Sequence, residues 1–341
     1  MTNFYKLSGE AQCEKLALLA EAAVDQWNLS VESLELIKHR ENAVYKLTTK
    51  EGVRYAVRVH RANYHSNAAL NSEIQWMEAL RCKANVITPE FVKAPKGEYF
   101  LVVSHEEVPE PRQVDILEWV DGEAMGSIEE GITNSALSLT DSFSLIGEIA
   151  AQCHNHSSTW KLPKGFSRQA WDLDGLVGED PVWGKFWELE ALSAAEVKIM
   201  IQVHGKLRKI LSEFGQSSDR YSLIHCDLLP ENLLHCGDHY KLIDFDDSGF
   251  GWHLFDLATS LFFHLGEDYF DDITAAWVEG YRKHRELSDE HLAMLPVFLM
   301  ARGTTYLGWA HTRKETDDAK ELTPIVKEGV LALAEHFLAE E

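Results

Sequence analysis

The chain lacks the sequence features of a membrane or secreted protein. No apolar run approaches the length needed to cross a bilayer. The N-terminal stretch MTNFYKLSGEAQ has neither the charged start nor the apolar core of a secretory signal. Because these signals are missing, we expect a cytoplasmic protein with no membrane partner.

Cysteine is scarce and follows no ligand pattern. The chain has five cysteines, an odd number, and none of them stands in C-x-x-C spacing. Disulfide frameworks and zinc sites use paired or regularly spaced cysteines. We therefore expect reduced thiols at Cys13, Cys82, Cys153, Cys226 and Cys236.

Positive charge is also in short supply. The sequence has 32 Lys and Arg residues against 55 Asp and Glu residues, which gives a formal net charge of −23. This charge would repel a phosphate backbone, so we expect no nucleic-acid partner. It suits the attraction of a cationic substrate such as an amino alcohol, although acidity also serves solubility alone.

One stretch, residues 221–265, concentrates the residues that can carry chemistry. His225, Asp227 and Asn232 stand in an H-x-D-x-x-x-x-N arrangement, and Asp244 follows in the run Leu-Ile-Asp-Phe-Asp-Asp. Phosphoryl transfer needs one carboxylate beside the attacking hydroxyl, and an amide oxygen with a second carboxylate to hold magnesium on the triphosphate. Asp227 suits the first task, and Asn232 with Asp244 suits the second. A His-x-Asp pair alone arises easily by chance, but the ordered set favours chemistry.

The spacing within this stretch also predicts a hairpin. Apolar pairs at 233–234 and 242–243 indicate two short strands, and residues 236–239 indicate the turn between them. Asn232 stands just before the first strand and Asp244 at the end of the second. We therefore expect these two side chains to be adjacent in the fold.

The motifs IHCDLLPEN and IDFDD resemble those of the aminoglycoside phosphotransferase and choline kinase group of kinase-like enzymes. The resemblance covers nearly the whole chain and implies ATP and Mg²⁺ as cofactors. It implies that Asp227 is the catalytic base and that Asn232 and Asp244 are the magnesium ligands. It also implies that His225 and Asp256 support the catalytic loop.

The resemblance extends to the nucleotide-binding part of such enzymes. Arg58 stands where the family's strand lysine or arginine contacts the α- and β-phosphates, and its expected partner is Glu73. The alternatives are an exposed strand charge and a solvated helix face. The adenine is expected to bond to the backbone around Glu118 and Val120. Unlike protein kinases, the chain has no glycine in the phosphate-loop stretch 38–43.

The residue pattern changes from strands to helices near Gly122. Together with the resemblance, this change predicts an α+β, bilobal, protein kinase-like fold. A β-rich N-terminal lobe over residues 1–120 would bind ATP, and a helical C-terminal lobe over 121–341 would carry the chemistry and bind the acceptor. Helices are expected at 255–264, 269–284, 288–312 and 324–339. His154 and His156, at the end of a helix from about residue 139, are interpreted as cap or surface residues.

The expected reaction is an ATP-dependent kinase reaction on a hydroxyl of a small metabolite. Candidate acceptors are amino alcohols and hydroxy amino acids such as homoserine, choline and hydroxylysine, and nothing excludes an antibiotic. Two alternatives stay open. One is a protein Ser/Thr kinase of the bacterial stress-response type, which the group also resembles. The other is a catalytically silent nucleotide-binding module, which the intact Asp227, Asn232 and Asp244 argue against but which the missing glycine loop leaves open.

Two sets of residues bear on the acceptor. Asp246 and Asp247 could steer a cation or could serve only the geometry of their turn. Tryptophan faces attract cations, but packing between helices is an equally good explanation for them. These tryptophans are Trp171, Trp183, Trp187 and Trp309.

Overall fold

The computed structural model describes residues 4–40, 42–127, 131–133 and 136–339, so Glu41 of the glycine-free stretch lies outside the described residues. The chain divides into two compact units. One comprises Met1–Glu78, Thr88–Asp121 and Pro163–Ser167. The other comprises Ala79–Ile87, Gly122–Leu162 and Arg168–Glu341.

The first unit is built on an antiparallel sheet with the strand order β1-β2-β3-β5-β4. Its strands are β1 (Val31–His39), β2 (Ala43–Thr49), β3 (Arg54–Val59), β4 (Phe100–Val103) and β5 (Arg112–Glu118). Its helical segments are η1 (Phe4–Lys6), α1 (Gly9–Val24), η2 (Asp25–Trp27) and the first part of α2 (Asn67–Lys83). The predicted hairpin of residues 43–48 and 53–59 is confirmed as β2 and β3.

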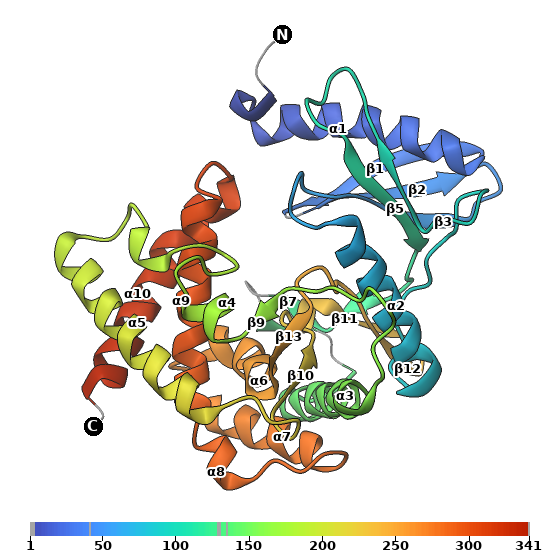
Figure 1. Cartoon of the computed structure of the whole chain (residues 1–341). Helices are drawn as coiled ribbons and strands as arrows, with labels where there is room; N and C mark the ends of the chain where they lie inside the picture. Colours follow the sequence, from blue (N-terminus) through green and yellow to red (C-terminus); the bar gives the residue numbers. More distant parts are fainter. Residues whose placement is uncertain (1–3, 41, 128–130, 134–135, 340–341) are drawn as a thin grey trace. The chain divides into compact units, whose positions relative to one another are not determined.

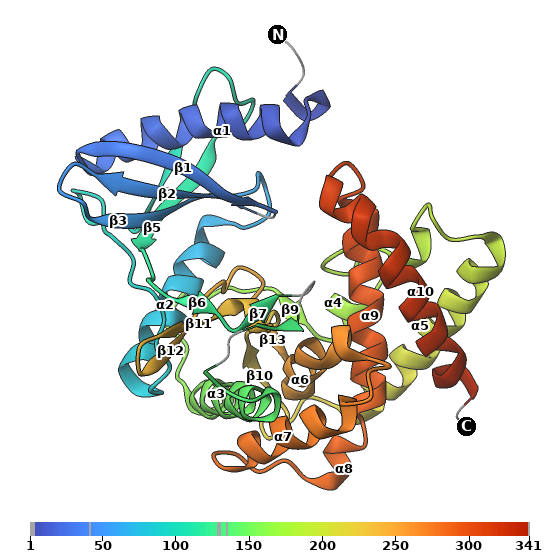
Figure 2. The ribbon, with the colours of Figure 1, turned by 180° about the vertical axis from the view of Figure 1, so that it is seen from behind.

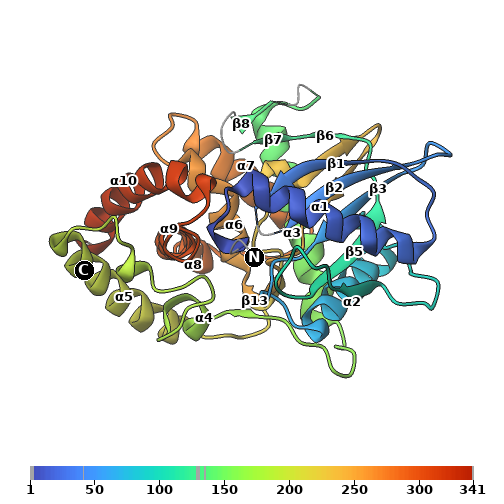
Figure 3. The same ribbon diagram turned by 90° about the horizontal axis from the view of Figure 1, so that it is seen from above.

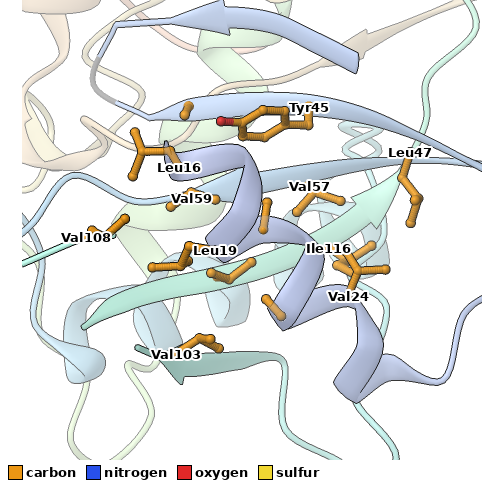
Figure 4. Packing of buried hydrophobic residues seen from close by; sticks show 14 of the residues in the cluster. Leu16, Leu19, Val24, Tyr45, Leu47, Val57, Val59, Val103, Val108 and Ile116 are labelled. Atoms are coloured by element: carbon orange, nitrogen blue, oxygen red, sulfur yellow. The ribbon is translucent and has the colours of Figure 1, made fainter. Parts of the chain in front are cut away.

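Helix α1 covers one face of this sheet (Figure 1). Figure 4 shows Leu16 and Leu19 of α1 lying against strand residues that include Val57, Val59 and Ile116. The side chain of Ser8 caps the helix by accepting a hydrogen bond from the backbone N–H of Ala11. Burial of these aliphatic groups is the main stabilising contribution that the core makes. The core thus fixes the strands on which the charged residues of the unit stand.

The second unit is mainly helical. Its helices are α3 (Leu139–Thr159), α4 (Leu173–Val177), α5 (Ala194–Phe214), α6 (His253–Leu261), α7 (Phe270–Arg282), α8 (Asp289–Leu292), α9 (Leu295–Thr312) and α10 (Asp317–Ala339), with short turns η3 (Phe186–Glu188), η4 (Pro230–Asn232) and η5 (Phe262–His264). Its short strands are β6 (Glu123–Ala124), β7 (Gly126–Ser127), β8 (Gly131–Ile132), β9 (Ala170–Trp171), β10 (Tyr221–Ile224), β11 (Leu233–Cys236), β12 (His239–Leu242) and β13 (Gly249–Trp252).

The helices of this unit pack in two groups. Helices α3 and α7 lie side by side beneath α6 and β10 (Figure 2). Helix α9 is flanked by α5 and α10 (Figure 3) and also packs against α6. A β-rich first unit and a helical second unit confirm the predicted α+β class.

Two helix predictions were wrong near prolines. The helix expected over 288–312 is interrupted, because α8 ends at Leu292 and Pro296 opens α9. Proline suits the first turn of a helix, where no N–H is needed. The helix expected to start at Pro324 begins instead at Asp317. Pro324 lies on an exposed face of α10, where water can solvate the carbonyl that receives no N–H.

No helix within the described ranges is long and apolar enough to span a bilayer.

Candidate functional site

The hairpin predicted around the motif is confirmed. Strands β11 and β12 pair antiparallel from Leu233 opposite Leu242 to the turn at Gly237, which has a φ of +65°. One step beyond the paired strands, the backbone N–H of Ile243 donates to the carbonyl of Asn232 at 2.9 Å. Asp244, the next residue along, therefore follows directly beside Asn232.

The Asp227 carboxylate is held at both oxygens. The Asn232 side chain donates from Nδ2 to Oδ2 of Asp227 at 3.0 Å and to its backbone carbonyl at 2.8 Å. The Arg302 guanidinium donates from Nη2 to Oδ1 at 3.1 Å. The side chain of Asp227 still exposes 21% of its surface. A partly exposed carboxylate in a defined orientation can accept a proton from a bound hydroxyl.

Two residues of the motif have left-handed backbone conformations that non-glycine residues adopt rarely. Cys226, just before Asp227, has a φ of +70°, and Asp244 has a φ of +63°. Cys226 is fully buried, and burial raises the pKa of its thiol well above the ordinary value. Uncommon backbone conformations of this kind concentrate at functional sites, where the surrounding structure holds them.

A buried carboxylate holds the backbone before Asp227. Asp256, at the start of α6, accepts hydrogen bonds from the backbone N–H of His225 at 3.1 Å and of Cys226 at 2.7 Å. The ring of His225 contacts the carbonyl of Ile243 through Nε2 at 3.0 Å. Burial raises the pKa of Asp256, against the lowering effect of His225 and of the two backbone N–H groups. His225 and Asp256 therefore lie behind the loop rather than beside an exposed carboxylate.

The interpretation of His154 as a cap or surface residue was wrong. Helix α3 continues to Thr159, and His154 is fully buried inside it. Its Nε2 lies 3.0 Å from Oδ2 of Asp256 and its Nδ1 lies 2.9 Å from the hydroxyl of Tyr281. Burial lowers the pKa of His154 well below its ordinary value, so the ring is neutral. The apolar face of α3 on which His154 falls was the sequence signal for this position.

The donor set beside Asp227 fits a magnesium ion. Because Asn232 donates through Nδ2, its amide oxygen is the atom left for a cation. Asp244 is exposed to solvent and adds a carboxylate. Magnesium in kinase sites is bound by one or two such protein oxygens together with substrate phosphates and water.

The first unit contains a separate cluster of buried charges. Arg58 on β3 forms the expected ion pair with Glu73 of α2, at 3.0 Å between Nη1 and Oε1. It also donates from Nε and Nη2 to the two oxygens of Asp115 at 2.8 and 2.7 Å. The His60 ring lies 2.8 Å from the same carboxylate. All four residues are buried, so Arg58 and Glu73 are neither an exposed strand charge nor a solvated helix face.

Asp115 was missed as part of this cluster. It stands directly opposite Arg58 in the register of β3 and β5 and has apolar neighbours on both sides in the sequence. Burial alone would raise the pKa of Asp115, but Arg58 and His60 hold it at about 2. An acidic residue inside an otherwise apolar strand was the available signal, because such a charge needs a buried partner.

Glu118 ends β5, and its backbone N–H donates to the carbonyl of Glu90 at 2.9 Å. Val120 lies two residues further on, outside any helix or strand. It directly precedes Asp121, at which this segment of the first unit ends. Phe91, next to Glu90, forms an isolated bridge with Leu117 of β5.

The tryptophans of the second unit lie in different surroundings. Trp171 is fully buried and packs against Trp183 and Phe255. Two guanidinium groups of the protein itself lie over Trp183, Arg302 at 5.0 Å and Arg313 at 5.8 Å. The ring of Trp183 therefore already contacts cations.

The other two tryptophans considered for the acceptor, Trp187 and Trp309, are half-buried. Trp187 packs with Phe186 and His204, and Trp309 lies beneath Arg313 at 5.7 Å. Asp246 and Asp247 are buried, in a turn whose backbone carbonyls accept hydrogen bonds from Arg168 and Trp171. That turn is therefore held by its backbone.

Comparisons with known proteins agree with this geometry. Residues 33–291 match the profile of the phosphotransferase enzyme family, APH. The structure of a microcompartment-associated aminopropanol kinase is similar over 95% of this chain and 98% of that one, with a TM-score of 0.82 and 32% sequence identity.

Two amicoumacin kinases are also similar. The enzyme of Bacillus subtilis (strain 168) is 25% identical over 322 residues, which cover 86% of this chain and 84% of that protein. The structure of the kinase hAmiN in complex with AMP-PNP, Ca²⁺ and Ami has a TM-score of 0.71 at 20% identity and covers 95% of this chain and 93% of its own. These likenesses confirm the predicted kinase-like fold, and the chain belongs to the phosphotransferase enzyme family.

Proposed function

We propose that this protein transfers the γ-phosphoryl group of ATP to a hydroxyl of a small metabolite. The observation that carries the proposal is the arrangement of Asp227, Asn232 and Asp244 in the second unit. One carboxylate is oriented by two hydrogen bonds, and an amide and a second carboxylate stand side by side at the end of a hairpin. This set meets the needs of phosphoryl transfer, in which positioning and charge stabilisation supply most of the catalysis.

In the proposed reaction, Asp227 orients the acceptor hydroxyl and takes its proton. The acceptor oxygen forms a bond to the γ-phosphorus, and the bond between that phosphorus and the β–γ bridging oxygen breaks. The products are a phosphate monoester and ADP. His225 and Asp256 support the loop, since Asp256 holds two of its backbone N–H groups.

Asn232 and Asp244 would hold the metal ion of the nucleotide, for which we propose Mg²⁺. When bound, this ion neutralises charge on the phosphates. The kinase hAmiN was solved with Ca²⁺ and AMP-PNP, so a divalent cation and a nucleotide analogue occur together in a similar fold.

We propose that the first unit, formed mainly from residues 1–120, contributes the nucleotide-binding groups, and that residues 121–341 contribute the chemistry and the acceptor site. Arg58 would contact the phosphates, supported by its position on β3 and its ion pair with Glu73. The backbone around Glu118 and Val120 would receive the adenine.

For the acceptor we propose an amino alcohol or hydroxy amino acid. The similarity to an aminopropanol kinase, at 32% identity over nearly the whole of both chains, supports this class. The formal net charge of −23 suits a cationic acceptor. A cytoplasmic location fits the five cysteines, which are all free thiols.

The test is an ATP-consumption screen with Mg²⁺ against hydroxylated amines, hydroxy amino acids, sugars and a generic protein substrate. Turnover with one small molecule, and phosphate on its hydroxyl, is the expected result. Phosphate that appears only on protein would replace the proposal with a protein kinase. Binding of the magnesium nucleotide without any transfer would favour a silent module.

The role of Asp227 is tested separately with the acceptor that the screen identifies. Asp227→Asn removes the proton acceptor and should lower kcat by about 10²- to 10⁴-fold, while calorimetry shows binding of Mg–AMP-PNP retained. Asp244→Asn should instead raise the Mg²⁺ concentration that gives half-maximal rate. Full activity of Asp227→Asn would show that Asp227 is not the catalytic base.

A further inference from the structure

Arg302 is a buried cation beside the proposed base. It lies on α9, its side chain has no exposed surface, and its Nη2 donates to Oδ1 of Asp227 at 3.1 Å and lies 2.8 Å from the hydroxyl of Tyr306. Burial alone would lower the pKa of the guanidinium, but Tyr306, Cys226 and Asp227 raise it. Arg302 is therefore a permanent positive charge in contact with the residue that is to accept the proton.

Aromatic rings enclose this charge. The guanidinium carbon lies 4.2 Å from the ring centre of Tyr306, 5.0 Å from that of Trp183 and 5.5 Å from that of Phe255. Its Nε and Nη1 are buried and have no hydrogen-bond partner among the described residues. The cation is thus balanced by one carboxylate and by ring faces, which attract a desolvated guanidinium. We call Arg302 with these three rings the arginine cage.

The backbone of the cage is held by close packing. An added Cβ on Gly308 of α9 would lie 2.5 Å from the carbonyl oxygen of Gly184. The hydroxyl of Thr312 donates to the carbonyl of Trp183 at 2.9 Å. Only a glycine at 308 allows this approach, which fixes the segment that carries the Trp183 ring.

The cage leaves Asp227 little freedom to rotate. The terminal torsion of an aspartate side chain has a broad energy minimum, so a carboxylate turns easily unless hydrogen bonds hold it. Here Arg302 holds Oδ1 and Asn232 holds Oδ2. Both oxygens of the Asp227 carboxylate therefore keep a fixed orientation, and so does the part of the carboxylate that is exposed to solvent.

We propose that Arg302 is a positioning residue for phosphoryl transfer, which acts by fixing the orientation of the Asp227 carboxylate from within the arginine cage. The inference rests on the proposed function. Arg302 lies outside both sequence motifs, and it touches Asp227 rather than any exposed surface. A buried ion pair is weak evidence for a stabilising role, because desolvation offsets the attraction between its charges.

The stability of the fold does not require this cation. When Arg302 is replaced by methionine, the partner left behind is Asp227, which water reaches and Asn232 still contacts. No fully buried charge is stranded. Arg302→Met should therefore keep or raise the thermal midpoint, while kcat falls about 100-fold, as expected for a misplaced reacting group.

Arg220 offers a control arginine. It lies over one aromatic ring, that of Phe214 at 4.7 Å, pairs with the exposed carboxylate of Asp219 at 3.2 Å and donates from Nη1 to the carbonyl of Phe214 at 2.9 Å, while its own side chain keeps 26% of its surface exposed. Arg220→Met therefore removes an arginine–ring contact and an arginine–carboxylate pair that do not involve Asp227. It should leave kcat unchanged.

The experiment compares wild type, Arg302→Met and Arg220→Met for kcat, acceptor KM and Mg–AMP-PNP affinity. The expected result is a loss of kcat confined to Arg302→Met, with acceptor KM and nucleotide affinity close to wild type. In Arg302→Ala, which leaves a guanidinium-sized space, added guanidinium chloride should restore part of kcat. This rescue would not follow from a merely structural role.

Two outcomes would overturn the inference. One is an Arg302→Met enzyme with wild-type kcat, and the other is an equal loss in both methionine variants without rescue by guanidinium. These differ from failure of the proposed function, which would appear in wild type itself as nucleotide binding with no transfer to any acceptor. That result would also exclude the positioning role of Arg302.

Discussion

The two units each bury an arginine against carboxylates, but they neutralise it in different ways. In the first unit, every nitrogen of the Arg58 guanidinium donates to a carboxylate oxygen of Glu73 or Asp115, and both acids are buried. In the second, Arg302 has one carboxylate partner, which is partly exposed, and aromatic rings surround the rest.

The two clusters are therefore suited to different roles. The Arg58 cluster has two acids for one guanidinium and a histidine, so its members depend on one another for charge balance, and removing one leaves a buried charge. The Arg302 cluster gives its carboxylate only one hydrogen bond from the cation, so Asp227 stays available for a substrate. We expect substitutions in the first cluster to lower stability, in addition to any loss of the proposed phosphate contact at Arg58, and substitutions in the second to change turnover with little effect on stability.

Arg58→Met should have the largest effect on stability. It leaves Glu73 and Asp115 buried without their shared cation, and the free energy of unfolding should fall by about 3–5 kcal/mol. Thermal or urea unfolding, followed with a spectroscopic signal from the first unit, measures this loss. Arg54→Met is the control on the same strand, because Arg54 pairs with Asp121 at the surface and should cost at most about 1 kcal/mol. Equal losses in the two variants would contradict the assignment.

Asp115→Asn should change how the stability of the fold depends on pH. The folded pKa of Asp115 is about 2, below its ordinary value of 3.8. Its ionised form therefore stabilises the fold at pH values above about 4, by roughly 2 kcal/mol, and this contribution disappears as pH falls toward 2. The difference in thermal midpoint between wild type and Asp115→Asn should be largest near pH 6 and shrink below pH about 4. A difference that is independent of pH would exclude the ion-pair explanation.

Gly308→Ala tests the geometry of the arginine cage without touching its charge. The added methyl would meet the carbonyl of Gly184 and displace the segment that carries Trp183. We expect kcat to fall about tenfold, which corresponds to about 1.4 kcal/mol, with nucleotide affinity unchanged. Gly205→Ala on α5 is the control, since an added methyl there meets nothing within 4 Å.

The smallest expected effect concerns His253, which stacks on His154 behind the loop, with ring centres 4.3 Å apart. Burial lowers the pKa of His253 well below its ordinary value of 6.5, so the folded ring stays neutral while the unfolded ring takes a proton. Its contribution is present above about pH 6.5 and is lost as pH falls. His253→Gln should show a smaller drop in the free energy of unfolding than wild type between pH 7.5 and about 5.5, by roughly 1 kcal/mol, as measured by urea unfolding at the two pH values. An unchanged drop would mean that other groups cause the acid sensitivity.

The features of this protein that depend on local spacing could be predicted from the sequence. The order of Asp227, Asn232 and Asp244, the glycine turn between β11 and β12 and the alternation of β2 and β3 all follow from neighbours along the chain. The pair of Arg58 and Glu73 was expected only from the resemblance to the kinase family, because nothing in the local spacing joins the strand residue to the helix residue. Pro296 also indicates the start of α9, although we assigned that segment to one longer helix.

The contact of His154 with Asp256 and that of Arg302 with Asp227 follow only from tertiary packing. His154 and Asp256 are separated by 102 positions and Arg302 and Asp227 by 75, and no periodicity within either segment connects them. Tertiary packing also decided that Trp183 meets a guanidinium of its own chain. These contacts depend on how α3, α6 and α9 pack, because burial, not sequence distance, determines which polar groups need each other.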